Sequence, residues 1–369
     1  MITRAAFFIS PHGFGHAARA SAVMAAMHEI CPTIEFEIFT TIPLWFFEES
    51  LSAPFSYHFL LTDIGLVQDT PMHADLTKTI EHLDKFLPFE KPQIAQLAQI
   101  IDKLKCKLVI CDIAPMGIMV AREAGIPSVL VENFTWDWVY QEYKSYNPRL
   151  NRHVDYLKTI FDSTDYHIQT EPICSYSSAD LTTSPVSRTV KVPARQVREK
   201  LGIANDTRMV VITMGGVPAQ FSFLNELSHQ RDFCIVIPGG SNSLKINGNL
   251  ILLPHHSDFF HPDLIMASNA VVGKVGYSTL AEIYHTGVPF GYIMRPNFRE
   301  SEILAAYIEN QMNGIAIKEA EFQDGGWVSH LPRLLALPDI KRNSPNGAEQ
   351  IAGFLCNLLL SLYDNPDAA

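Results

Sequence analysis

Short apolar runs alternate with amphipathic stretches along the whole chain. Runs such as Leu108–Cys111 and Phe233–Ile237 are apolar at successive positions, as in strands that are buried on both faces. Stretches such as Lys91–Leu104 place apolar residues three and four apart, as in helices that bury one face. This alternation predicts α/β domains built on parallel sheets.

The alternation occurs twice, on either side of the Ser/Thr/Pro-rich stretch 182–188. A chain of 369 residues is also long for one hydrophobic core. We therefore predict an N-terminal Rossmann-like domain over residues 1–185 and a C-terminal one over residues 186–345. Residues 346–369 have apolar positions at helical spacing, and we expect this helix to cross back to the N-terminal domain.

The loop after the first predicted strand, Ala5–Ser10, is rich in glycine and histidine. It reads Pro11-His-Gly-Phe-Gly-His-Ala-Ala-Arg19. Gly13 and Gly15 allow a ligand to approach the backbone closely, at the strand end where open α/β sheets bind ligands. Ala18 stands where a dinucleotide-binding turn needs its third glycine, which disfavours a nicotinamide site.

A carboxylate follows another strand of the same predicted sheet. Asp112 comes directly after Leu108–Cys111, and His16 follows the first strand. Because the carboxyl ends of parallel strands meet at one edge, this pair is placed to act as an imidazole base and the group that orients it. Two simpler interpretations remain open: His16 has a structural hydrogen bond, and Asp112 caps the next helix.

Two further loops carry polar and aromatic residues. In the stretch 132–138, Asn133 and Trp136 suit a sugar platform or lid, while core packing is the alternative. The loop 62–75 contains ionisable residues, including Asp63, whose spacing matches no metal motif; we interpret it as a solvated loop.

The second half contains a strand–turn–helix unit. Ala270–Val272 is predicted as a strand, Gly273–Gly276 as a turn, and about Leu280–His285 as a helix that Ser278 or Thr279 caps. Helix N-termini attract phosphate, so this turn is a candidate anion site, with an ordinary turn as the alternative.

Chemistry can be assigned to single residues of this unit. Lys274 adds a full positive charge at the turn, and Glu282 can accept hydrogen bonds from a vicinal diol such as a ribose. The glycine pair Gly215-Gly216 follows the first strand of the second predicted domain, again at a ligand-facing end.

These motifs resemble those of GT-B glycosyltransferases. Gly276-Tyr-Ser-Thr-Leu-Ala-Glu282, followed by Gly287-Val-Pro289, looks like their donor-nucleotide signature. The His-Gly-Phe-Gly-His-Ala-x-Arg loop resembles a loop in the glycosyltransferase-like N-terminal region of plant L-arabinokinase. The likeness to that region covers nearly the whole chain, and the kinase domain is absent. The resemblance implies two Rossmann-like domains facing each other across a cleft.

The resemblance also implies roles for single residues. His16 would be the catalytic base and Asp112 its partner. Donor binding would fall to Gly215, Gly216, His255, Lys274, Gly276, Ser278, Thr279, Glu282, Glu300 and Glu302. The acceptor side and cleft would comprise His12, Gly13, Gly15, Arg19, Asn133 and Trp136.

The function that the resemblance implies is transfer of a sugar from a nucleotide-sugar donor, UDP-linked, to a hydroxyl acceptor, with inversion. The chain has no Asp-x-Asp motif, so we expect no metal, and no cofactor besides the nucleotide sugar as co-substrate. A UDP-sugar 2-epimerase-type enzyme and a non-catalytic sugar-nucleotide-binding regulator are the open alternatives.

Net charge and hydropathy argue against some classes of partner and location. The net charge of −11, without a Lys/Arg run, argues against nucleic acid. No apolar stretch has the length of a membrane span, and the first residues have too short an apolar run for a signal peptide. We expect a cytoplasmic protein; contact with a membrane surface and the oligomeric state stay open.

Overall fold

The computed structural model describes residues 3–215, 221, 223–227 and 232–364. The chain divides into two compact units. Unit 1 comprises Met1–Val67, Ala74–Ser187 and Ser344–Ala369, and unit 2 comprises Gln68–His73 and Arg188–Asn343. The units therefore change after Ser187, two residues from the boundary that the sequence suggested. The short segment of unit 2 between the parts of unit 1 had no signal in the sequence.

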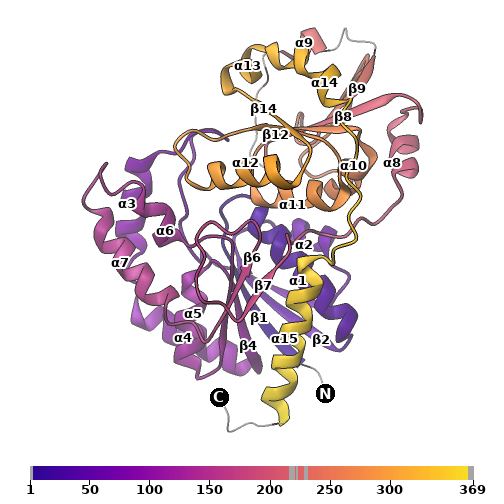
Figure 1. Ribbon diagram of the computed structural model, residues 1–369. Coiled ribbons are helices and arrows are strands. Elements are labelled where there is room, and N and C mark those ends of the chain that lie inside the picture. Colours follow the sequence, from indigo (N-terminus) through magenta and orange to yellow (C-terminus); the bar gives the residue numbers. More distant parts are fainter. Residues whose placement is uncertain (1–2, 216–220, 222, 228–231, 365–369) are drawn as a thin grey trace. The chain divides into compact units, whose positions relative to one another are not determined.

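A parallel sheet forms the centre of unit 1 (Figure 1). In the described part of the chain it has seven strands in the order β3-β2-β1-β4-β5-β6-β7. The order reverses between β1 and β4, and this switch point is where open α/β sheets place their ligands. The strands are β1 (Thr3–Ile9), β2 (Ile34–Thr40), β3 (Phe55–Phe59), β4 (Cys106–Asp112), β5 (Ser128–Glu132), β6 (Tyr166–Thr170) and β7 (Leu181–Thr183).

Helices surround this sheet, and the C-terminal helix α15 packs against α1 and β7. Gly347 at the start of α15 allows a close approach, because a Cβ there would lie 2.1 Å from the Ser184 carbonyl oxygen. The helices of unit 1 are α1 (Gly15–Ile30), α2 (Leu44–Ser50), α3 (Leu76–Phe86), α4 (Lys91–Lys103), α5 (Pro115–Ala124), α6 (Trp136–Gln141), α7 (Leu150–Phe161) and α15 (Gly347–Asp364).

Unit 2 repeats the plan. Its sheet, as far as the structure describes it, has seven strands in the order β10-β11-β9-β8-β12-β13-β14; only β10 is antiparallel to its neighbour. The reversal lies between β8 and β12. The strands are β8 (Arg208–Thr213), β9 (Phe233–Ile237), β10 (Lys245–Asn247), β11 (Leu250–Leu252), β12 (Ala270–Lys274), β13 (Phe290–Ile293) and β14 (Gly314–Ile317).

Apolar clusters cover both faces of this sheet, and Met72 from the short segment joins one of them. No helix within the described residues is both long enough and apolar enough to cross a membrane. The helices of unit 2 are α8 (Ala194–Leu201), α9 (Leu224–Leu227), α10 (His261–Ala267), α11 (Tyr277–Thr286), α12 (Glu300–Gln311), α13 (Glu319–Asp324), η1 (Gly326–His330) and α14 (Leu331–Leu334).

One predicted detail of unit 2 was wrong. Strand β12 continues to Lys274, because that residue still pairs with Ile293 in the parallel ladder. Helix α11 then begins at Tyr277, and its N-cap is Gly276, which has no side-chain capping hydrogen bond. Ser278 and Thr279 thus lie inside the first turn of the helix and do not cap it. The predicted fold class, with two Rossmann-like parallel-sheet units, is confirmed.

Candidate active site

The switch point of unit 1 brings His16 and Asp112 together. Gly13 has a positive φ of 69°, so the loop after β1 can turn sharply into α1. His16 lies in the first turn of that helix, and Asp112 is the last residue of β4. The Nδ1 atom of His16 is 3.0 Å from Oδ1 of Asp112, and both residues are buried.

Arg19, one turn further along α1, binds the same carboxylate. Its Nε donates to Oδ2 of Asp112 at 2.8 Å and its Nη2 donates to Oδ1 at 2.7 Å. Its Nη1 donates to Oδ1 of Asn133 at 2.8 Å. Arg19 is only 1% exposed and Asn133 is fully buried. Both were expected at the acceptor side or in the cleft, and in the structure both are buried and bonded to protein groups.

These contacts decide how the imidazole is held. Burial alone would raise the pKa of Asp112, but the neighbouring Arg19 charge and the donated hydrogen bonds outweigh it and lower that pKa. The carboxylate is therefore ionised, and Nδ1 of His16 carries the proton that it donates. Nε2 makes no hydrogen bond with any residue that the structure describes. An imidazole held in this way can accept a proton at Nε2.

The second histidine of the loop has a different environment. The His12 ring meets Trp136 edge to face with centroids 5.1 Å apart, and its Nδ1 accepts a hydrogen bond from the Leu66 backbone N–H at 3.4 Å. Gly65 makes room for it, since a Cβ there would lie 2.8 Å from Nδ1 of His12. His12 is therefore packed against the loop after β3.

Trp136 is a core residue, only 1% exposed. Its indole N–H donates to Oδ2 of Asp63 at 3.1 Å, and the Ser10 hydroxyl donates to Oδ1 of Asp63 at 3.0 Å. Of the two interpretations of Trp136, the structure favours core packing over an exposed sugar platform. The interpretation of loop 62–75 as solvated was wrong for Asp63, which is 3% exposed, because two donors satisfy the buried carboxyl.

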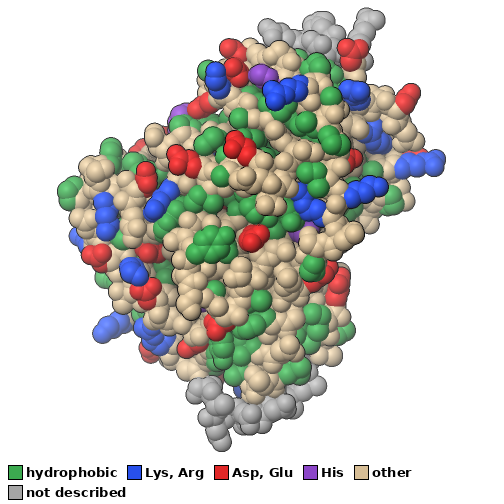
Figure 2. Space-filling view, viewed as in Figure 1, with side chains coloured by type: hydrophobic (Ala, Val, Ile, Leu, Met, Phe, Trp, Pro, Cys, Tyr) green, Lys and Arg blue, Asp and Glu red, His purple; other side chains and the backbone are tan. Residues whose placement is uncertain are grey.

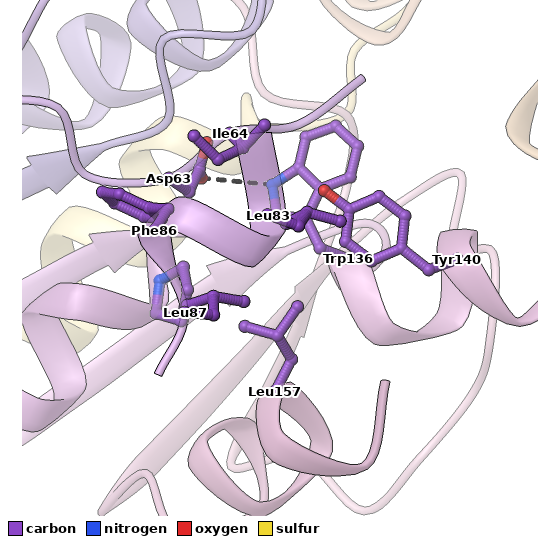
Figure 3. Close-up of a pocket in the computed structure, with 9 residues that line it drawn as sticks. Asp63, Ile64, Leu83, Phe86, Leu87, Trp136, Tyr140 and Leu157 are labelled. Atoms are coloured by element: carbon purple, nitrogen blue, oxygen red, sulfur yellow. Dashed lines mark hydrogen bonds between the residues drawn. The ribbon is translucent and has the colours of Figure 1, made fainter. Parts of the chain in front are cut away.

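A small cavity of about 10 Å³ lies beside Asp63 (Figure 3), with room for about one water molecule. Apart from Asp63 its lining is mainly apolar and aromatic. Burial raises the pKa of Asp63 to about 7, against the lowering effect of the two hydrogen bonds. The residues lining the cavity are Asp63, Ile64, Leu83, Phe86, Leu87, Pro115, Trp136, Tyr140 and Leu157.

The switch point of unit 2 carries a buried ammonium group. Lys274 ends β12 and is 8% exposed. Its Nζ lies against Gly215, just after β8, where an added Cβ would be 3.3 Å away. Burial and the nearby Arg295 charge lower the pKa of Lys274 to about 7, while Glu300 acts in the opposite direction. Gly216 lies outside the described residues.

Glu282 is buried and bonded at both oxygens. Oε1 accepts from Nε and Nη2 of Arg188 at 3.1 and 3.0 Å, and Oε2 accepts from Nδ1 of His261 at 2.8 Å. Nε2 of His261 lies 3.1 Å from the Thr213 hydroxyl. Burial would raise the pKa of Glu282, but the Arg188 and His261 charges outweigh it and lower that pKa. Sequence reasoning missed both partners, since neither belongs to a recognisable motif.

The other predicted donor residues have mixed environments. Thr279 is buried and Ser278 half-buried at the start of α11, after Gly276. Glu300 is buried at the start of α12, while Glu302 is exposed.

His255 is exposed and fits against Gly239, where a Cβ would lie 2.8 Å from its Nδ1. Among the described residues, no group of three or more His, Cys, Asp or Glu side chains could hold a metal ion. Figure 2 shows one face of the molecule, on which Lys/Arg and Asp/Glu side chains are interspersed.

The sequence matches the family described as glycosyl transferase family 1 over residues 4–334. The chain belongs to that family. This identifies it as a glycosyltransferase, as the resemblance of its motifs had implied.

Two relatives are similar over most of the chain. L-arabinokinase of Arabidopsis thaliana is 28% identical over 355 residues, which are 95% of this chain and 34% of the relative. The chain thus spans about a third of that protein. The UDP-N-acetylglucosamine–N-acetylmuramyl-(pentapeptide) pyrophosphoryl-undecaprenol N-acetylglucosamine transferase of Bacillus licheniformis is 24% identical, covering 66% of this chain and 69% of the relative.

Solved structures of glycosyltransferases have the same fold. Spinosyn forosaminyltransferase SpnP aligns with a TM-score of 0.60 at 16% identity, covering 98% of this chain and 100% of its own. The glycosyltransferase VinC, in complex with dTDP, also aligns with a TM-score of 0.60, at 14% identity over 97% of this chain and 100% of its own. The predicted GT-B fold is confirmed.

Proposed function

We propose that this glycosyltransferase moves a sugar from a UDP-linked donor to a hydroxyl group of an acceptor, with inversion at the anomeric carbon. Unit 1 supplies the base and unit 2 binds the donor. The observation that carries the proposal is the hydrogen bond of His16 Nδ1 to the ionised Asp112, which leaves Nε2 available to accept a proton.

In the proposed reaction, Nε2 of His16 takes the proton of the acceptor hydroxyl. The acceptor oxygen bonds to the anomeric carbon as the bond from that carbon to the diphosphate breaks, and UDP leaves with the electron pair. Asp112 stabilises the imidazolium that forms, and Lys274 stabilises the leaving diphosphate. No step requires a metal ion or another cofactor.

Support for a diphosphate in unit 2 comes from charge. Lys274 is a buried cation next to Gly215 and close in sequence to the start of α11, and it makes no hydrogen bond within the described residues. Such a group is costly unless an anion compensates it, and helix N-termini favour phosphate. The UDP base is inferred from the Bacillus licheniformis relative, whose name specifies a UDP-linked sugar.

A non-catalytic role in binding sugar nucleotides is the second candidate, because the chain matches only 34% of the length of L-arabinokinase. Incubation with a panel of UDP-sugars and hydroxyl acceptors separates the two, with dTDP-glucose as a control for the base. Release of UDP that depends on an acceptor supports transfer. Binding without release of UDP supports the non-catalytic role. Formation of an epimerised sugar would contradict both candidates and indicate a 2-epimerase.

A further inference from the structure

The surroundings of Arg19 assign it a role that its position in the loop did not indicate. Its guanidinium is enclosed by four elements, α1, β4, the loop after β5 and β6. Nε and Nη2 hold both oxygens of Asp112, while Nη1 lies 2.8 Å from Asn133 Oδ1 and 3.4 Å from the Thr170 hydroxyl. With 1% of its surface exposed, Arg19 does not reach a substrate.

We propose that Arg19 is a positioning residue that fixes Asp112 against His16 and uses its own charge to keep the imidazole neutral, so that Nε2 stays a base. This role rests on the proposed function only in that His16 is the base. The arrangement of donors around Asp112 can be tested without any turnover.

The geometry constrains the proton on the ring. Nη2 of Arg19 and Nδ1 of His16 approach the same oxygen, Oδ1 of Asp112, at 2.7 and 3.0 Å. Nη2 and Nδ1 are themselves 3.4 Å apart. If the ring proton moved to Nε2, the Nδ1 lone pair would face the carboxylate oxygen, which is repulsive. The arrangement therefore selects the tautomer with its proton on Nδ1.

The charges constrain the second proton. A lone carboxylate beside an imidazole stabilises the imidazolium form, and a cation at similar distance opposes it. Here Nη2 of Arg19 lies 3.4 Å and Oδ1 of Asp112 3.0 Å from Nδ1, so the guanidinium opposes the effect of the carboxylate on a doubly protonated ring. Without Arg19, the ring would take its second proton at a higher pH.

Unit 1 contains a comparison pair that lacks the arginine. Nε2 of His167 lies 2.8 Å from Oε1 of Glu132, and within the described residues no guanidinium binds that carboxylate. Burial would lower the pKa of His167, but the hydrogen bond and charge of Glu132 outweigh it and raise that pKa. At His16, by contrast, the neighbouring carboxylate is also bound by a guanidinium.

The other ionisable groups around this network are few. Asp63, in the loop after β3, is close enough for the charge of Asp112 to raise its pKa further, in addition to burial. Cys111 precedes Asp112 on β4, and burial raises the pKa of its thiol, which stays neutral. His12 packs on Trp136. Because burial raises the pKa of Asp63 to about 7, this group ionises within the pH range of the titration in the wild type, and the variants are compared with that background in mind.

The test follows the histidine rings of the full-length protein by NMR. Protein labelled with ¹⁵N-histidine is titrated from about pH 5 to pH 9, and the His16 signals are assigned by their loss in His16→Gln. In the wild type we expect one neutral tautomer with the proton on Nδ1. In Arg19→Met the second proton should bind at a pH higher by roughly one unit or more. The His167 signals, in the same sample, should not move.

Arg19→Lys is the matched variant, because it keeps the charge but not the fork. Its His16 titration should stay within roughly half a unit of the wild type. A folded Arg19→Met protein with an unchanged titration would overturn the proposal. If Arg19→Met does not fold, Arg19→Lys decides: a His16 titration midpoint that lies roughly one pH unit above that of the wild type would overturn the proposal.

The same variants are then assayed for release of UDP across the pH range. Arg19→Met should lose activity on the acid side, with the midpoint of that loss moved upward as in the titration, while KM for the donor changes little. If neither wild type nor variants release UDP under any condition, the proposed function fails. The ring titration still decides the role of Arg19 in that case.

Discussion

The two switch points carry buried charges that are treated in opposite ways. In unit 1, the carboxylate of Asp112 is matched by a guanidinium and an imidazole, at 2.7 to 3.0 Å. In unit 2, the ammonium of Lys274 is also buried but has no hydrogen bond within the described residues, and its pKa falls to about 7 although the Glu300 charge opposes that fall. The carboxylate of Asp112 thus has hydrogen-bond donors at both oxygens within unit 1, whereas the ammonium of Lys274 has no hydrogen-bond acceptor within the described residues.

The difference indicates that the site in unit 1 holds a side chain in a fixed orientation and that the site in unit 2 binds a ligand. A base must be held in one orientation before the substrate arrives, so the protein itself supplies all partners of Asp112. A buried cation that has no hydrogen-bonded counter-charge is destabilising, and a bound anion reduces that cost. This contrast favours proton transfer in unit 1 and diphosphate binding in unit 2.

The largest effect is expected when the proposed base in unit 1 is removed. His16→Ala should lower the rate of sugar transfer by roughly 10²–10⁴-fold, because no other group can take the proton at that position. UDP affinity, measured by calorimetry, should remain close to that of the wild type, since unit 2 is untouched.

His12→Ala is the matched control for His16→Ala, from the same loop but without a bond to Asp112. It should reduce the rate much less. If His12→Ala abolishes transfer and His16→Ala does not, the assignment of the base is wrong.

Lys274 tests the other side of the comparison. Lys274→Ala should reduce turnover by roughly 10²-fold and donor binding by less, if the ammonium stabilises the leaving diphosphate. With a pKa of about 7, Lys274 is mostly neutral at pH 8, and a bound diphosphate favours its charged form. Binding of UDP at pH 8 should therefore take up close to one proton, as measured by calorimetry in buffers of different ionisation enthalpy. Equal proton uptake by the variant would contradict this role.

Glu282→Gln addresses a matched ion pair inside unit 2. Glutamine keeps one acceptor oxygen but no charge opposite Arg188, so donor affinity should fall by roughly 1.5–3 kcal/mol if the carboxylate also binds the ribose. If the role of Glu282 is only to hold Arg188 and His261, stability to urea falls and affinity does not. Asp206→Asn, which also removes one negative charge from unit 2 but at an exposed position, is the control and should alter neither.

The smallest effect is expected at Asp63. Its folded-state pKa of about 7 is above the ordinary value of 3.8, so the folded state binds an extra proton between these values. Stability from this group falls as the pH rises, by about 1 kcal/mol from pH 6 to pH 8. Asp63→Asn should remove this decline in urea denaturation.

Asp75→Asn serves as the control for Asp63→Asn. The pKa of Asp75 is lowered, chiefly by the hydrogen bond from the Lys78 backbone N–H, so it is already ionised at pH 6. The decline in stability should persist in that variant. Its disappearance there, with no change in Asp63→Asn, would assign the pH dependence elsewhere.

Hydropathy patterns located the strands, although not the ends of each strand. The run Phe233–Ile237 has the bounds of β9, and the run Leu108–Cys111 covers the centre of β4, which spans Cys106–Asp112. Because parallel strands end at a common edge, the same patterns also predicted that His16 lies near Asp112. The motif at Lys274 was likewise visible, as local strand–turn–helix signals are.

Side-chain partners were decided only by the tertiary structure. Arg19 was expected at the acceptor side, but packing turns it inward onto Asp112, 93 positions away in the chain. Arg188 and Glu282 meet across 94 positions, and Asp63 is buried by Trp136 from 73 positions away. Periodicity reports which face of an element is buried, because it reflects local geometry. Which distant group satisfies a buried charge depends on how the elements pack, and no local pattern records that.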